Sequence, residues 1–155
     1  MISGMDRATI AVKVAGIEEL DLLVPLFDAY RQFYRKASDL EGARHFLKAR
    51  IERAESVVLL AMEGASAIGF TLLYPSFSSA AMARIFILND LFVSPAARRR
   101  GLGADLLDAA VKYARGEGAV RMVLSTETTN VTAQALYEKS GWKRELNFLV
   151  YQLAL

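Results

Sequence analysis

The feature that most constrains the fold is an apolar run that leads through a basic, glycine-containing turn into a helical repeat. Residues 84–93 (RIFILNDLFV) are rich in Ile, Phe, Leu and Val and end at Ser94-Pro95, which is typical of a buried strand. Residues 102–114 then carry apolar side chains at helical spacing, until glycines at 116 and 118 end the pattern. The sequence therefore predicts a sheet covered by helices, with residues 84–93 as its central strand.

The rest of the chain supplies further strands and helices. Alternating or continuous apolar runs predict strands over residues 8–14, 57–62, 67–74, 120–125 and 148–155. Helical spacing predicts helices over residues 17–34, 38–55 and 131–139. Pro25 either kinks the first helix or lies in its first turn, Ser38 and Glu41 form a capping box for the second, and residues 75–80 read as a loop. The order β-α-α-β-β-β-α-β-α-β predicts an α/β or α+β fold, a mixed sheet with helices on both faces.

Length and composition limit the classes of protein that this chain can be. At 155 residues and 54% hydrophobic residues, the chain suits one domain over residues 1–155. A net charge of +2 gives little support for a nucleic-acid partner, and no segment is apolar enough for a membrane span or a signal peptide, so we expect a cytoplasmic protein. With no cysteine and with His45 as the single histidine, we expect no metal site.

The basic turn has the properties of an anion site. Backbone amides at the start of a helix lack partners and lie at the positive end of the helix dipole, so amides from Arg98 to Ala104 are suited to a pyrophosphate. Glycine at 101 and 103 allows close approach. The Gly-Lys-Ser/Thr ending of a P-loop is absent, and the dinucleotide fingerprint fails because Leu106 stands at its third glycine.

Two motifs together resemble one family. Arg98-x-x-Gly101-x-Gly103 after the strand is similar to the acyl-CoA loop of the GNAT family of N-acetyltransferases. The later block Asn130-x-x-Ala133-x-x-Leu136-Tyr137-x-x-x-Gly141-Trp142 looks like that family's second conserved block. Residues 30–34 (YRQFY), 75–79 (PSFSS) and 87–91 (ILNDL) look like its Hpa-type branch, named for yeast histone and polyamine acetyltransferases.

The resemblance implies a fold, a cosubstrate and a set of roles. The fold is a mostly antiparallel sheet of six to seven strands, split between residues 88–93 and 120–125 to hold the pantetheine of acetyl-CoA. The residues implied in acetyl-CoA binding are Leu91, Phe92, Val93, Arg98, Arg99, Arg100, Gly101, Leu102, Gly103, Ala104 and Asn130. An amide near Leu91 or Phe92 is implied as the oxyanion donor, and Tyr137 as the acid that protonates the departing thiolate.

The chemistry and the acceptor are predicted less fully. Either Asp90 or an ordered water removes the amine proton, and strand alternation places Asn89 on the face opposite Asp90. Tyr30, Tyr34, Phe77 and Asn89 are candidates for acceptor contact. The acceptor is a small-molecule amine or a protein lysine or amino terminus, and the Hpa-type resemblance implies a homodimer. Without cysteine we expect direct transfer in a ternary complex, and a non-catalytic acyl-CoA sensor is the alternative.

Overall fold

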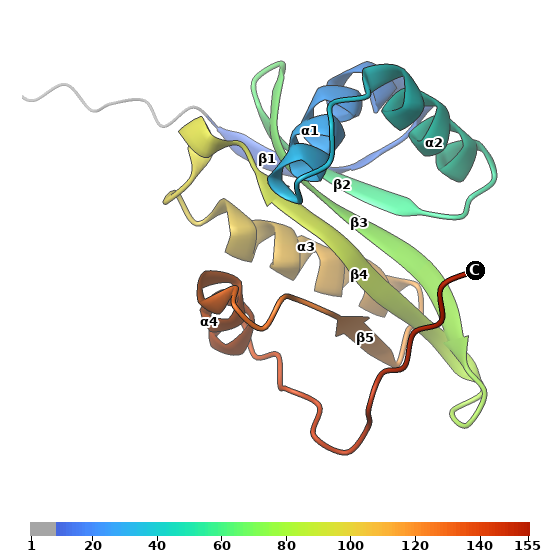
Figure 1. The fold of residues 1–155 in the computed structure, drawn as a ribbon. Helices are drawn as coiled ribbons and strands as arrows, with labels where there is room; N and C mark the ends of the chain where they lie inside the picture. Colours follow the sequence, from blue (N-terminus) through green and yellow to red (C-terminus); the bar gives the residue numbers. More distant parts are fainter. Residues whose placement is uncertain (1–8) are drawn as a thin grey trace, which may run out of the picture. The chain divides into compact units, whose positions relative to one another are not determined.

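The computed structural model describes residues 9–155 as two compact units, one that ends at Ser125 and a second over Thr126–Leu155 (Figure 1). In the first unit the strands are β1 (Ile10–Ala15), β2 (Val57–Glu63), β3 (Ser66–Ser78), β4 (Ala83–Val93) and β5 (Arg121–Leu124). Its helices are α1 (Leu20–Phe33), α2 (Leu40–Glu52) and α3 (Leu102–Gly116), with short 3-10 turns at Ile17–Glu19 and Pro95–Ala97. The second unit contains α4 (Val131–Lys139).

The strands form one sheet in the order β1-β2-β3-β4-β5. Neighbours from β1 to β4 pair antiparallel, and β5 pairs parallel to β4 after the α3 crossover. The predicted mixed, mostly antiparallel α/β sheet is therefore confirmed. Within the described residues the sheet has five strands, not the six to seven that the family resemblance implied.

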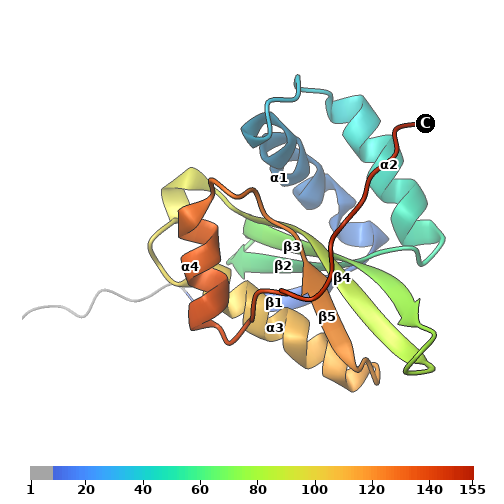
Figure 2. The same cartoon turned by 60° about the horizontal axis from the view of Figure 1, so that its bottom comes forward.

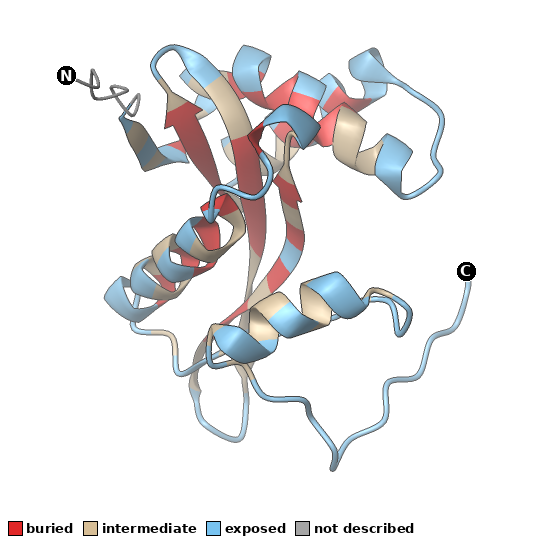
Figure 3. Ribbon diagram, turned by 90° about the vertical axis from the view of Figure 1, so that its left-hand side faces the viewer, coloured by how far each residue is buried: buried red, intermediate tan, exposed pale blue. Residues whose placement is uncertain are grey.

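Helices cover both faces of this sheet. Helices α1 and α2 lie on one face and α3 on the other, as two views of the first unit agree (Figures 1 and 2). Burial follows this layering, because buried residues concentrate in the central strands and on the sheet-facing sides of the helices (Figure 3). The core on the α1 side is built from apolar residues of six elements, among them Leu23, Phe27, Leu47, Leu60 and Phe70.

Strand β4 contains one residue more than its partner β3 at a β-bulge. Leu72 faces Asp90 and the next residue, Leu73, faces Leu88, so Asn89 has no opposite residue on β3. An extra residue shifts the alternation of side chains by one position and so exchanges the faces of the strand. In the two halves of β4, even-numbered side chains therefore point to opposite faces of the sheet.

Aromatic contacts show this exchange of faces directly. The ring of Phe86 lies 5.8 Å from Tyr113 of α3, whereas the ring of Phe92 lies 6.4 Å from Tyr30 of α1. Both residues have even numbers, and a regular strand would place them on the same face. Because of the bulge at Asn89, the even-numbered Phe92 after it faces α1, whereas the even-numbered Phe86 before it faces α3.

The predicted final strand over residues 148–155 is wrong, because residues 143–155 form neither helix nor strand. The sequence FLVYQLAL has high strand propensity, but a strand is stable only when its backbone groups pair with a neighbour. The described part of Thr126–Leu155 has one helix and no strand, so this unit itself offers no partner. The prediction for residues 148–155 rested on strand propensity alone, which does not show whether a neighbouring strand is available for pairing.

Three local predictions also change. Helix α1 continues through Pro25 without a break, and residues 75–78 extend β3 where a loop was expected. The cap of α2 is Asp39, whose carboxylate accepts a hydrogen bond from the amide of Gly42, because Ser38 instead donates to Asp28. Part of the predicted first strand, at Ala8, lies outside the described residues. Among the described helices, none combines the length and apolar character of a membrane span.

Candidate active site

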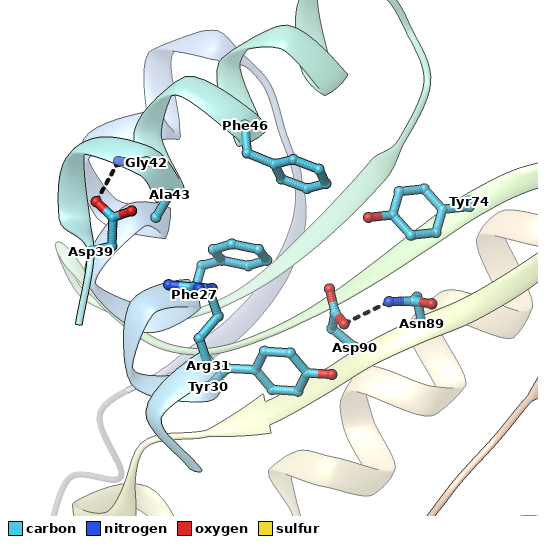
Figure 4. A pocket seen from close by; sticks show the side chains of 10 residues that line it. All are labelled: Phe27, Tyr30, Arg31, Asp39, Gly42, Ala43, Phe46, Tyr74, Asn89 and Asp90. Atoms are coloured by element: carbon cyan, nitrogen blue, oxygen red, sulfur yellow. Dashed lines mark hydrogen bonds between the residues drawn. The ribbon is translucent and has the colours of Figure 1, made fainter. Parts of the chain in front are cut away.

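A cavity of about 400 Å³ lies between α1, α2 and the bulged part of the sheet (Figure 4). It is lined by Phe27, Tyr30, Arg31, Asp39, Gly42, Ala43, Phe46, Tyr74, Asn89 and Asp90. All of these residues belong to the first unit, and both residues at the bulge are among them. The cavity thus joins an aromatic wall from the helices and β3 to a polar end on β4.

Asp90 is the buried carboxylate at this polar end, with 3% of its surface exposed. Desolvation raises the pKa of Asp90 above its ordinary value, and hydrogen bonds with Tyr30 and Asn89 partly oppose this rise. Thr71 holds the backbone at this point, because its Oγ1 donates to the carbonyl oxygen of Asp90 over 2.8 Å. A buried carboxylate with a raised pKa, facing a cavity, is suited to accept a proton.

Asn89 does not lie on the opposite face from Asp90, as strand alternation predicted. Its Nδ2 donates to Oδ1 of Asp90 over 2.9 Å, and both side chains line the same cavity (Figure 4). The reason is the bulge, which breaks the alternation at this residue. Asn89 therefore orients the carboxylate beside it.

The turn before α3 has the geometry of an anion site. Gly101 is the N-cap of α3 in the left-handed region, with φ of 79°, and nothing lies within 4 Å of the position where a side-chain Cβ would be. The first backbone hydrogen bond of the helix runs from the amide of Asp105 to the carbonyl of Gly101. The amides between these residues thus precede the helical hydrogen bonds, and they are the groups that bind phosphate at a helix start.

The sheet opens next to this turn. Strand β5 pairs with β4 only from Ile85 to Leu88 among the described residues, although β4 continues to Val93. Beyond Leu88, the edge of β4 toward β5 has no strand partner in the described part of the chain. An extended ligand can hydrogen-bond to such an edge as an added strand would.

The three arginines of the turn have different surroundings. Arg98 Nε donates to the carbonyl of Val93 over 3.0 Å, and its guanidinium lies 5.9 Å from the ring of Phe33. Arg100 forms an ion pair with Glu63 at the turn between β2 and β3. Arg99 is exposed, adopts a φ of 63°, and makes no ion pair with any described carboxylate. Arg98 and Arg100 thus have partners that stabilise the turn, whereas Arg99 is exposed, and the predicted contacts of these arginines with phosphate stay predictions.

A sequence profile of the Acetyltransferase (GNAT) family matches residues 23–142, which include the cavity, the turn before α3 and the Asn130–Trp142 block. The chain belongs to the GNAT family. It is 51% identical over 142 residues to the uncharacterized N-acetyltransferase YhfO of Bacillus subtilis (strain 168), covering 92% of this chain and 95% of that protein. This GNAT chain is accordingly an acyltransferase.

Solved structures agree with the GNAT assignment. A crystal structure described as that of a probable acetyltransferase has a TM-score of 0.89 and 43% sequence identity, and covers 94% of this chain and 97% of its own. The aminoglycoside N-acetyltransferase AAC(6')-Iy, solved in complex with CoA, has a TM-score of 0.80 at 16% identity and covers 95% of this chain and 96% of its own. The second likeness is one of fold.

The GNAT structure brings some predicted acceptor residues together and separates others. Tyr30 lines the cavity beside Asp90, and Tyr34 packs on Tyr30 with ring centroids 4.9 Å apart. Phe77 does not line the cavity: it is 68% exposed near the end of β3, and the guanidinium of Arg84 lies 4.9 Å from its ring. The predicted contact of Phe77 with the acceptor has no support from the lining of this cavity.

Several cavity residues were not identified from the sequence. Tyr74 lies on β3 at the same parity as the core residues Phe70 and Leu72, so strand alternation was a usable signal for it. Burial and the nearby charge of Asp90 raise the pKa of Tyr74. Phe27 and Phe46 are helical aromatic residues that sequence patterns do not distinguish from core residues.

The second unit contains the other predicted site residues. Asn130 caps α4, because its Oδ1 accepts a hydrogen bond from the amide of Ala133 over 3.2 Å. The rings of Tyr137 and Trp142 are 6.3 Å apart, and the amide of Trp142 donates to the carbonyl of Tyr137 over 3.0 Å. Asn130 is thus the N-cap of α4, and its predicted contact with acetyl-CoA and the chemical role of Tyr137 stay predictions.

Proposed function

We propose that this enzyme moves acetyl from acetyl-CoA directly to the nitrogen of a primary amine in a ternary complex. The observation that carries the proposal is the buried carboxylate of Asp90, which faces a cavity at the bulge where β4 and β5 part. The nearby start of α3 fits the cosubstrate, since its amides and the open space at Gly101 suit a pyrophosphate. AAC(6')-Iy, which shares the fold, has been solved with CoA.

Each step assigns a proton to a named group. Asp90, directly or through a water, takes a proton from the bound ammonium, because an amine attacks only with a free electron pair. The nitrogen then bonds to the thioester carbonyl carbon, and a β4 amide near Leu91 or Phe92 donates to the developing oxyanion. As the C–S bond breaks, Tyr137 gives its phenolic proton to the thiolate, whose electron pair comes from that bond.

The raised pKa of Asp90 favours its role as a base. A carboxylate with its ordinary pKa is a weak base toward an ammonium with a pKa of about 10, and burial narrows this difference. The hydrogen bond from Asn89 holds Oδ1 of Asp90 and leaves the carboxylate directed into the cavity. Activity should therefore rise with pH through the raised pKa of Asp90, and Asp90→Asn should abolish this limb of the profile.

The first experiment combines calorimetric binding of acetyl-CoA with thiol release in the presence of mixed primary amines. Tyr137→Phe should lower kcat by about 10²–10⁴-fold with little change in acetyl-CoA affinity, as expected for loss of a general acid. The matched control is Tyr151→Phe, which removes a hydroxyl from an exposed residue outside any helix or strand. Binding of acetyl-CoA without any thiol release would instead favour the non-catalytic sensor, and ping-pong kinetics would contradict direct transfer.

The homodimer and the cytoplasmic location expected from the sequence stay predictions. Light scattering in solution tests whether the protein is a homodimer.

A further inference from the structure

The cavity beside Asp90 has an aromatic wall. The rings of Phe27 and Phe46 stack with centroids 5.9 Å apart and planes 11° apart, and Tyr30 lies 6.3 Å from Phe27. Tyr74 stands across the cavity and directs its hydroxyl inward (Figure 4). Aromatic faces bind apolar groups by contact and cations through their negative π surface, so this wall suits an amine with an apolar body.

The charges that line the cavity nearly balance. Two carboxylates, Asp39 and Asp90, and one guanidinium, that of Arg31, are present. Asp39 already caps α2, because its Oδ1 accepts from the amide of Gly42 over 2.9 Å. Asp90 is therefore the one carboxylate in the lining that is not engaged in a helix cap.

This balance discriminates between amine acceptors. A polyamine or an aminoglycoside has several ammonium groups, and each group beyond the first would find only the capping carboxylate of Asp39 and would meet the positive charge of Arg31. A single ammonium, in contrast, finds Asp90 at one end and aromatic rings for the rest of the molecule. The volume of about 400 Å³ lies at the small end of ligand cavities and suits a body of one ring and a short chain.

Resting on the proposed function, we infer that the acceptor is a small primary amine with one positive charge and an aromatic or apolar body, as in the arylalkylamines. Its ammonium binds at Asp90 between Tyr30 and Tyr74. Its ring packs against Phe27 and Phe46. Arg31 acts as a selectivity residue, because its charge disfavours polycations.

The test compares kcat/KM for four acceptors. The rate is measured as thiol release by the 155-residue chain at saturating acetyl-CoA. The acceptors are 2-phenylethylamine, spermidine, kanamycin and a peptide with a blocked amino terminus and one lysine. We expect 2-phenylethylamine to exceed each of the others by at least about tenfold, the factor that corresponds to one favourable ring contact. A higher value for spermidine, kanamycin or the peptide would overturn the inference, although release with any amine would still support the proposed transfer.

Variants connect this ranking to the cavity. Phe46→Ala should raise KM for 2-phenylethylamine about tenfold and leave acetyl-CoA affinity unchanged, since Phe46 lines the acceptor cavity from α2 and is not part of the turn before α3. Leu40→Ala, an exposed apolar position on the same helix, is the control and should change neither quantity. Arg31→Gln should improve kcat/KM for spermidine several-fold. If Phe46→Ala leaves KM unchanged, the acceptor does not bind against this wall, and if no amine releases thiol, transfer itself is refuted.

Discussion

Replacement of Asp28 by alanine should strongly destabilise the protein, because this buried carboxylate joins the end of α1 to the start of α2. Asp28 has 3% of its surface exposed and accepts three hydrogen bonds. Its donors are Oγ of Ser38 at 2.7 Å, the amide of Asp39 at 2.8 Å and Nε2 of Gln32 at 3.0 Å. Two of these donors precede the first turn of α2, which forms one side of the cavity.

The magnitude follows from the donors that lose their acceptor. A hydrogen bond to a charged group contributes about 1.5–3 kcal/mol, and a buried donor left without a partner costs a similar amount. Gln32 and Ser38 are exposed residues whose side chains can turn toward water, whereas the backbone amide of Asp39 is held in place by the chain. We therefore expect Asp28→Ala to lower the free energy of unfolding by about 3 kcal/mol, or the melting temperature by about 6–12 °C for a chain of this size.

The assay is thermal and urea unfolding of the variant beside the unchanged protein. Asp108→Ala is the control, since this exposed aspartate of α3 should change stability by less than about 0.5 kcal/mol. The hydrogen bond from Ser38, followed by that from the Asp39 amide, lowers the pKa of Asp28, so its contribution is present above the unfolded-state pKa. It is lost as the pH falls through the lowered folded-state pKa, and the two proteins should converge there. A difference below about 1 kcal/mol at pH 7 would refute the reasoning.

Three further predictions concern the sheet and the active site. Gly69→Ala should lower stability by about 1–3 kcal/mol in urea unfolding, because its Cβ would lie 2.9 Å from the carbonyl oxygen of Phe92; Gly116→Ala, with open space around it, should not. Asp90→Asn should abolish most activity and yet raise the melting temperature at pH 7, because the raised pKa means that ionised Asp90 destabilises the fold, and an unchanged or lower value contradicts this. Gly101→Ala should weaken acetyl-CoA binding in calorimetry and cost about 1–2 kcal/mol of stability, because φ is 79° there.

Much of the fold follows from the sequence because its elements are defined by local patterns. Helical spacing located α2, α3 and α4 within a few residues, and apolar runs located the hairpin of β2 and β3 and the long strand β4. The glycine and arginine motif before α3 indicated an anion site, since a helix start has that property in any fold. The two family blocks indicated the acyltransferase class through their resemblance to the GNAT family.

The candidate acceptor site depends on tertiary structure, since its residues come from four elements that are distant in sequence. The identity of the residues at 89 and 90 was readable, but the faces they occupy were not, because a bulge arises from the pairing of two strands. The same reason explains the missing strand at residues 148–155, whose propensity found no pairing partner within its own unit. The sequence by itself determined most of the helices and strands and the family, and it predicted an anion site at the turn before α3. Only the packing of helices against a bulged sheet decided that Asp90 is buried with a raised pKa beside an aromatic cavity, because desolvation and strand register are properties of the folded chain.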